Sequence, residues 1–137
     1  MDLIEGGIEH PIRHWYYSHK FWFIERTFKP KPGRQRNLID IGAGSALFSS
    51  ELLRKNLVDS VVAVDTGYAM EYQDSASGIE FRRYSDFQGF TDYLLTDVLE
   101  HVDNDLAFLK SKKAFQLNDL AFQESNLAFQ PVLIGIP

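Results

Sequence analysis

An aspartate and two glycines stand close together in the segment Asn37-Leu-Ile-Asp-Ile-Gly-Ala-Gly-Ser-Ala46. The apolar residues before the glycines predict a short strand, and the following run Leu-Phe-Ser-Ser-Glu-Leu-Leu-Arg54 predicts a helix. α/β proteins build nucleotide pockets in this way, because glycine lets the backbone approach a ligand and the first helical N–H groups can donate hydrogen bonds. We therefore expect Asp40, Gly42 and Gly44 to line a pocket for a nucleoside.

Acidic residues also follow three further segments that we expect to be strands. These segments and the residues after them are 60–64 with Asp65, 79–83 with Asp86 and Phe87, and 92–96 with Asp97. In open α/β sheets, ligands bind beyond the carboxyl ends of the strands, near the point where strand order reverses. There Asp65 can accept hydrogen bonds from a ribose diol, while Asp86 offers an acceptor for an exocyclic amine beside the aromatic face of Phe87.

Each of these positions also has a purely structural interpretation. The two glycines can form a tight turn, Asp65 can cap a helix, and Asp86 can be an ordinary loop acid. His101 is at least as well explained by a surface or helix-capping role as by a catalytic one. The order of four acidic strand ends is what favours a binding site.

The elements that must position these residues alternate along the chain. We expect strands at 37–41, 60–64, 79–83, 92–96 and 131–136, and helices at 45–56 and 104–115. This order predicts an α/β fold with a doubly wound, mainly parallel sheet joined by right-handed crossovers. The sequence Asn-Asp-Leu-Ala-Phe occurs at 104–108 and again at 118–122, which we interpret as a local duplication that lengthens a helix or loop.

Aromatic residues are concentrated between His10 and Phe28, at spacings that predict a helix burying most of its circumference. We expect its tryptophans to pack in the core rather than to close over the site. The segment Lys29-Pro-Lys-Pro-Gly-Arg-Gln-Arg36 cannot continue the helix. We therefore interpret residues 1–36 as an N-terminal helical cap with a linker, and 37–137 as the α/β core.

The glycine segment resembles the first motif of the class I S-adenosylmethionine-dependent methyltransferases. Val62-Ala-Val-Asp-Thr66 looks like the second motif, and Asp97-Val-Leu-Glu-His101 is similar to a segment of the small-molecule and lipid-type branches. The resemblance covers roughly residues 37–110 and implies a Rossmann-like core that binds S-adenosylmethionine. The cofactor-binding residues that it implies are Asp40, Gly42, Ala43, Gly44, Asp65, Thr66, Asp86, Phe87 and Asp97. His101 and Glu100 are its candidates for a general base.

The chain departs from the family pattern in three ways. Ala46 stands where a third glycine is usual, about a dozen residues separate Asp65 from the third strand, and the chain stops at Pro137 directly after the fifth predicted strand. The family sheet normally continues with a helix and an antiparallel pair of strands. Two expectations follow: a methyltransferase acting on a small-molecule or lipid acceptor, or a truncated, non-catalytic cofactor-binding module. In either case a second copy or a partner subunit could complete the sheet.

The composition of the chain limits the classes of protein to which it can belong. A chain of 137 residues with 45% hydrophobic and 24% charged residues is typical of one globular domain. There is no cysteine for a disulfide, a thiolate metal site or a nucleophile. The sequence shows neither a signal peptide nor an apolar run of ~18 residues, so we expect a cytoplasmic protein without a membrane span.

Charge and spacing disfavour three further functions. Residues 1–37 hold seven Lys or Arg and four acids, but the net charge of −5 disfavours nucleic-acid backbone binding. A nicotinamide or flavin oxidoreductase is disfavoured because its dinucleotide-binding motif needs a small residue where Leu47 stands. The four histidines lack the spacing of a metal-hydrolase site.

Overall fold

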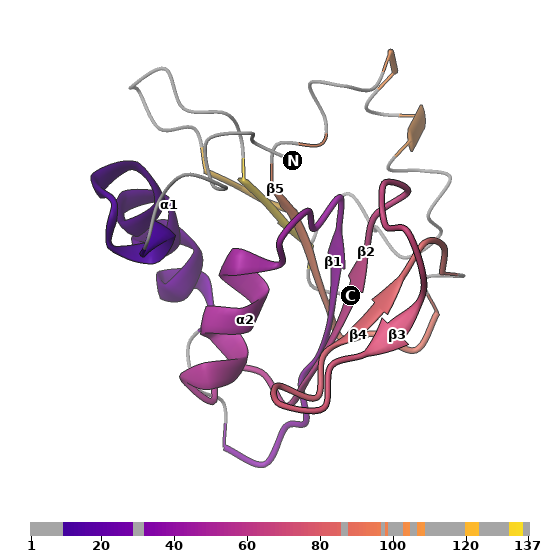
Figure 1. Ribbon diagram of the computed structural model, residues 1–137. Helices are drawn as coiled ribbons and strands as arrows, with labels where there is room; N and C mark the ends of the chain where they lie inside the picture. The colour runs from indigo at the N-terminus through magenta and orange to yellow at the C-terminus, as the bar shows by residue number, and fades with distance from the viewer. Residues whose placement is uncertain are drawn as a thin grey trace.

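The computed structural model describes residues 10–28, 32–85, 88–96, 98, 103–104, 107–108, 120–123 and 132–135. These residues form a seven-stranded sheet in the order β3-β4-β2-β1-β5-β7-β6 (Figure 1). The strands are β1 (Asn37–Ile41), β2 (Ser60–Val64), β3 (Tyr72–Gln73), β4 (Glu80–Arg82), β5 (Asp92–Thr96), β6 (Leu120–Gln123) and β7 (Val132–Gly135). The helical elements are the 3-10 turn η2 (Pro11–Arg13) and the α-helices α1 (Trp15–Thr27) and α2 (Leu47–Arg54).

The centre of the sheet is parallel, as the alternation of strands and helices predicts. β1 pairs in parallel with β2 on one side and β5 on the other, and β2 pairs in parallel with β4. Ile39 lies opposite both Val62 and Tyr93, and all three side chains are buried. Apolar, β-branched strands of this kind are typical of a sheet covered on both faces. The α/β arrangement expected from the sequence is confirmed at this level.

The two edges of the sheet are antiparallel. β3 runs antiparallel to β4, β7 antiparallel to β5, and β6 antiparallel to β7. The prediction that 131–136 joins the parallel sheet is therefore wrong in direction, because an apolar run predicts a strand without fixing which way it runs. The last three residues of the second copy, 120–122, lie in the strand β6, where a helix or loop was expected.

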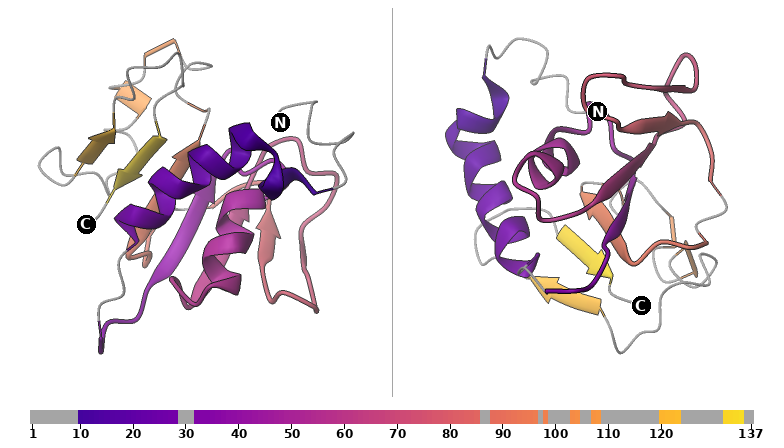
Figure 2. Two further views of the ribbon diagram at one scale, coloured as in Figure 1. Left: turned by 90° about the vertical axis from the view of Figure 1, so that its left-hand side faces the viewer. Right: turned by 90° about the horizontal axis from the view of Figure 1, so that it is seen from below.

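Both α-helices lie on one face of the sheet (Figure 2). Tyr17, Phe21 and Ile24 of α1 share a buried cluster with Phe48 and Leu52 of α2. The opposite face of the sheet forms a second cluster, against which Phe108 of a helical turn at 107–108 packs. Most of the helix predicted at 104–115 lies outside the described residues.

α1 buries less of its surface than the sequence predicts. Trp15 is 67% exposed and Trp22 is 45% exposed, so neither packs in the core. The buried positions Tyr17, Phe21 and Ile24 follow each other at intervals of four and three, which forms one stripe facing α2. α1 is therefore an amphipathic helix despite its many aromatic residues, and its two tryptophans face solvent.

α2 is shorter than predicted at both ends. It begins after Ala46, which adopts a left-handed conformation with φ 58°, and ends at Arg54. Asn56 is also left-handed, and Leu57 N donates to Leu52 O at 2.9 Å, as in a Schellman motif. None of the helices among the described residues has the length and apolar character needed to cross a bilayer.

A buried ion pair fastens the amino ends of β1 and β5. Arg36 Nη2 donates to Asp92 Oδ1 at 2.6 Å and Arg36 Nε donates to Asp92 Oδ2 at 3.2 Å. Thr91 Oγ1 donates to the same Asp92 Oδ2 at 2.7 Å. The Arg36 guanidinium also lies 4.7 Å from the ring centre of Phe28, the residue that ends α1. At this end of the sheet, the buried charges of Arg36 and Asp92 thus neutralise each other.

Candidate cofactor site at the glycine loop

The loop between β1 and α2 lies at the carboxyl ends of two neighbouring parallel strands. β1 has β2 on one side and β5 on the other, so the strand order reverses at β1. Figure 1 shows the loop running from the end of β1 into α2. Ligands of open α/β sheets bind at this kind of switch point.

The backbone of the loop requires glycine and is already engaged in hydrogen bonds. Gly42 and Gly44 have φ of 69° and 53°, in the left-handed region that favours glycine. Gly42 N and Ala43 N both donate to Val64 O, at 2.8 and 3.1 Å. Gly44 N donates to Asp65 Oδ2 at 3.0 Å. These three N–H groups bind the end of β2, so they do not form a cradle for phosphates.

Val98 occupies the space beside Gly42. A Cβ atom added to Gly42 would lie 2.5 Å from Val98 Cγ2, which no side chain tolerates without a shift. Gly42 is therefore needed for a close contact within the protein as well as for its φ. In this conformation, a ligand can approach the loop only from a side that Val98 does not cover.

Asp65 stands directly after β2 and is half-buried. Its Oδ2 accepts Gly44 N and its Oδ1 accepts Gly67 N at 2.8 Å, which fixes the carboxylate against the loop. Each carboxylate oxygen has two lone pairs, so each can accept one more hydrogen bond. Thr66, the next residue, is exposed. The carboxylate of Asp65 is thus both held in place and able to bind hydroxyl groups.

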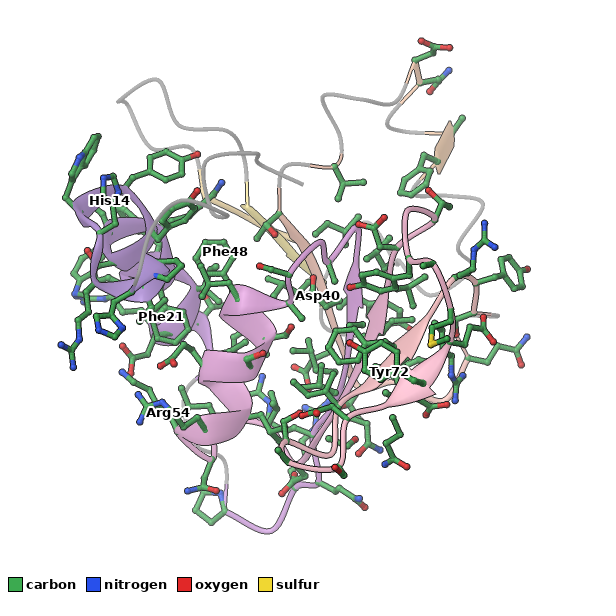
Figure 3. The ribbon with its side chains drawn as sticks, in the orientation of Figure 1. His14, Phe21, Asp40, Phe48, Arg54 and Tyr72 are labelled. Atoms are coloured by element: carbon green, nitrogen blue, oxygen red, sulfur yellow. The ribbon has the colours of Figure 1, made fainter. Side chains whose placement is uncertain are left out.

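Asp40 is the most unusual group of the site, because its carboxyl is only 2% exposed and faces no cation among the described residues. Its Oδ2 accepts Ser49 Oγ at 2.6 Å, but its Oδ1 has no hydrogen-bond partner in the described part of the chain. Figure 3 shows Asp40 between the sheet and the start of α2. Burial raises the pKa of Asp40 to about 7 against the hydrogen bond from Ser49, and the nearby Asp65 adds to the rise.

Tyr68 holds the loop from the opposite side. Its hydroxyl donates to Gly44 O at 2.8 Å, and its ring packs edge-on against Phe81 with centroids 5.5 Å apart. Burial raises the pKa of Tyr68, and the carboxylates of Asp40 and Asp65 raise it further. Gly44 is therefore bound through both its N–H and its carbonyl.

The structure brings together the first part of the predicted site. Asp40, Gly42, Ala43, Gly44, Asp65 and Thr66 all lie at this loop. Asp86, Phe87, Asp97, Glu100 and His101 lie outside the described residues.

Ser49, Tyr68 and Val98 also belong to the site and were not predicted from the sequence. Of these three, only Ser49 could have been predicted. It lies in the first turn of an apolar helix that follows the strand of Asp40, and a serine hydroxyl there can donate to a buried acid.

No group of three or more potential metal ligands occurs among the described residues. We also compared the chain with models of protein families, with curated proteins and with solved structures. None of the three comparisons found a match.

Proposed function

We propose that this protein binds S-adenosylmethionine at the glycine loop and transfers its methyl group to a small-molecule or lipid acceptor. The observation that carries the proposal is the Asp65 carboxylate, which Gly44 N and Gly67 N fix at the end of β2. It stands beside a glycine loop at the point where strand order reverses. An acid at that position of a parallel sheet is suited to the hydroxyls of a ribose.

The charge at the loop favours a cationic nucleoside over a dinucleotide. The acids Asp40 and Asp65 lie beside the loop, and the N–H groups of Gly42, Ala43 and Gly44 already donate to Val64 and Asp65. A pyrophosphate would meet two carboxyl groups there, and the N–H groups of Gly42, Ala43 and Gly44 are already used within the protein. The sulfonium and ammonium groups of S-adenosylmethionine carry the opposite charge and suit such a site.

The residues of the site would then divide the binding between them. Asp65 would accept the ribose hydroxyls, and Asp40 Oδ1, which lacks a partner among the described residues, would accept an N–H donor of the methionyl part. Tyr68 would keep Gly44 in position for both. When bound, the cofactor supplies an electrophilic methyl group. The protein's main task is then to hold an acceptor in line with that group.

The remaining contacts rest on the sequence alone. Asp86 and Phe87 are proposed for the adenine, Asp97 for the methionyl end, and His101 or Glu100 for a general base. A base is needed only where the acceptor must lose a proton.

A second candidate is a cofactor-binding module without turnover. On the side of β5, the next strand is the antiparallel β7, so the row of parallel carboxyl ends stops at β5. Within the described part of the sheet, the amino end of β7 lies there in place of a loop that follows a further parallel strand. This arrangement favours binding of a cofactor over binding of a second substrate beside it.

Calorimetry with S-adenosylmethionine and its demethylated product tests both candidates. We expect binding that weakens about tenfold or more in Asp65→Ala, because a charged acceptor is lost. Asp74→Ala is the matched control, since Asp74 also accepts backbone and hydroxyl hydrogen bonds, from Ser77, but in a turn outside the loop. Absence of heat with either compound would overturn the proposal. Transfer of labelled methyl to a lipid or small-molecule extract separates the enzyme from the module.

A further inference from the structure

The solvent-facing side of α1 carries an unusual set of exposed residues. Positions 15, 18, 19, 22 and 26 follow a helical repeat of three and four and are all exposed. They include Trp15 and Trp22, which are the only two tryptophans of the whole chain. Large exposed aromatic residues aligned on one helix face are a feature of interaction surfaces. We call Trp15, His19, Trp22 and Arg26, together with the exposed Arg13 at the end of the preceding η2 turn, the tryptophan face.

The tryptophan face is positively charged, although the chain as a whole is not. Arg13 and Arg26 are exposed, and the only acid of η2 and α1 is Glu25. Lys55 Nζ neutralises that acid at 2.6 Å. The chain has a net charge of −5, so the rest of the protein has the opposite sign. This asymmetry would orient the molecule with α1 toward an anionic partner.

The arrangement of the rings separates two kinds of anionic partner. Arg26 Cζ lies 4.4 Å from the ring centre of Trp22, and His19 stacks on the same ring at 6.2 Å with an interplanar angle of 18°. Arg26 thus covers one flat face of Trp22 and the imidazole of His19 lies nearly parallel to the ring, while stacking with a nucleic-acid base needs an open face. A partly exposed indole beside a cation, like Trp22 beside Arg26, suits the headgroup region of a bilayer.

We propose that the tryptophan face docks on the surface of an anionic lipid bilayer. The helix would lie in the plane of the interface, with Trp15 and Trp22 entering the headgroup layer and Arg13 and Arg26 meeting lipid phosphates. Tyr17, Phe21 and Ile24 on the other side of α1 stay packed in the protein core, so docking needs no unfolding. This proposal does not depend on the methyl-donor proposal.

Tryptophan fluorescence gives a direct test, because both tryptophans report on this face alone. We would titrate the full chain with phosphatidylcholine vesicles, with vesicles that also contain phosphatidylglycerol, and with a single-stranded oligonucleotide. We expect a shift of emission to shorter wavelength and reduced acrylamide quenching only with the anionic vesicles, reversed by high salt. A response to the oligonucleotide and not to the vesicles would overturn the proposal, and so would no response to either.

Variants assign the binding to the named residues. In vesicle co-sedimentation, Trp15→Ser combined with Trp22→Ser should lower the affinity roughly tenfold or more, as should Arg13→Glu combined with Arg26→Glu. Met70→Ser and Arg83→Glu change exposed residues outside α1 and should leave binding unchanged. Both tryptophans are exposed, so the serine variant should keep the wild-type circular dichroism spectrum. Equal vesicle binding by all four variants would contradict the proposed face.

Discussion

Two buried carboxyl groups of the same sheet have opposite surroundings. Asp92 begins β5 and Asp40 lies near the end of β1, and both point to the face that the helices cover. Asp92 accepts hydrogen bonds from Arg36 and Thr91, and so its charge is matched. Asp40 is equally buried, but it has Ser49 as its one described partner and the acid Asp65 nearby. One end of the sheet is satisfied, and the other retains unused binding capacity.

The difference separates structure from function within a single fold. A buried charge that is paired and hydrogen-bonded can be explained by stability and specificity of folding alone. A buried carboxyl without a cation lowers stability, and groups of this kind are concentrated at functional sites. The ends of α2 follow the same division. Its carboxyl end closes with a regular Schellman motif, while its amino end follows the left-handed Ala46 and has no side-chain cap.

The largest effect on stability should come from removing the buried ion pair between Arg36 and Asp92. Arg36→Met removes the cation and leaves Asp92 buried without a partner charge. We expect the free energy of unfolding to fall by about 3 to 5 kcal/mol, measured by urea denaturation at neutral pH. Arg82→Met is the control, because its ion pair with Glu80 is over a third exposed, and it should cost no more than about 1 kcal/mol. Equal losses would show that burial of the pair is unimportant.

The second prediction concerns pH and Asp40. Its folded pKa of about 7 lies above the ordinary 3.8, so the folded state holds a proton that the unfolded state releases. Stability from this group is complete below the unfolded pKa and is lost as pH rises to about 7. Asp40→Asn cannot titrate. The difference in the free energy of unfolding between Asp40→Asn and the wild type should therefore rise, in favour of the variant, by on the order of 4 kcal/mol between pH ~4 and pH ~8.

Urea denaturation of both proteins across that range measures this gain. Asp92→Asn gives the contrast, because it leaves Arg36 without its acid and should be less stable than the wild type at neutral pH. A stability difference between Asp40→Asn and the wild type that does not change with pH would contradict the unusual state of Asp40.

A third, smaller effect tests how the glycine loop is held. Tyr68→Phe removes the hydrogen bond to the buried Gly44 carbonyl and should cost about 1 to 3 kcal/mol of unfolding free energy. The same change should weaken S-adenosylmethionine binding in calorimetry, since Gly44 also fixes Asp65. Tyr72→Phe is the control, because Tyr72 is 49% exposed and lies on the edge strand β3. Unchanged stability in Tyr68→Phe would show that the loop does not need this bond.

The smallest expected effect lies at the regular end of α2. Asn56→Ala puts a Cβ-bearing residue with no local hydrogen-bonding ability at φ 56° and should cost about 1 kcal/mol in thermal or urea unfolding. Asn56→Gly should be neutral or slightly stabilising, because glycine adopts this conformation without strain. A larger loss with glycine than with alanine would contradict the capping role.

The parallel centre of the sheet could be predicted from the sequence with accurate bounds. Asn37–Ile41, Ser60–Val64 and Asp92–Thr96 were expected as strands and are observed with those limits. Short, mainly apolar runs of five residues between turn signals have few alternative structures. Tyr72–Gln73 was missed because two exposed residues carry no periodic signal. The direction of Val132–Gly135 was wrong because pairing partners, not composition, decide it.

The site could be predicted only in part, for a related reason. Asp40, Gly44 and Asp65 belong to local patterns, and the structure places them together. The contacts of Val98 with Gly42 and of Tyr68 with Gly44 join separate segments of the chain. Such contacts follow from the arrangement of elements in space, which spacing along the chain does not encode. The state of Asp40 likewise depends on burial by α2.

The contact between Phe28 and Arg36 has a consequence for the evolution and engineering of the chain. The Arg36 guanidinium lies against the ring of Phe28, the C-cap residue of α1, while the backbone N–H of Arg36 donates to Asp59 and its side chain to Asp92. Both ends of the seven-residue connection from 29 to 35 are thus anchored independently of its sequence. Lengthening a connection of this kind costs little closure entropy. An affinity tag or a small reporter domain inserted there should leave both the helix and the sheet in place.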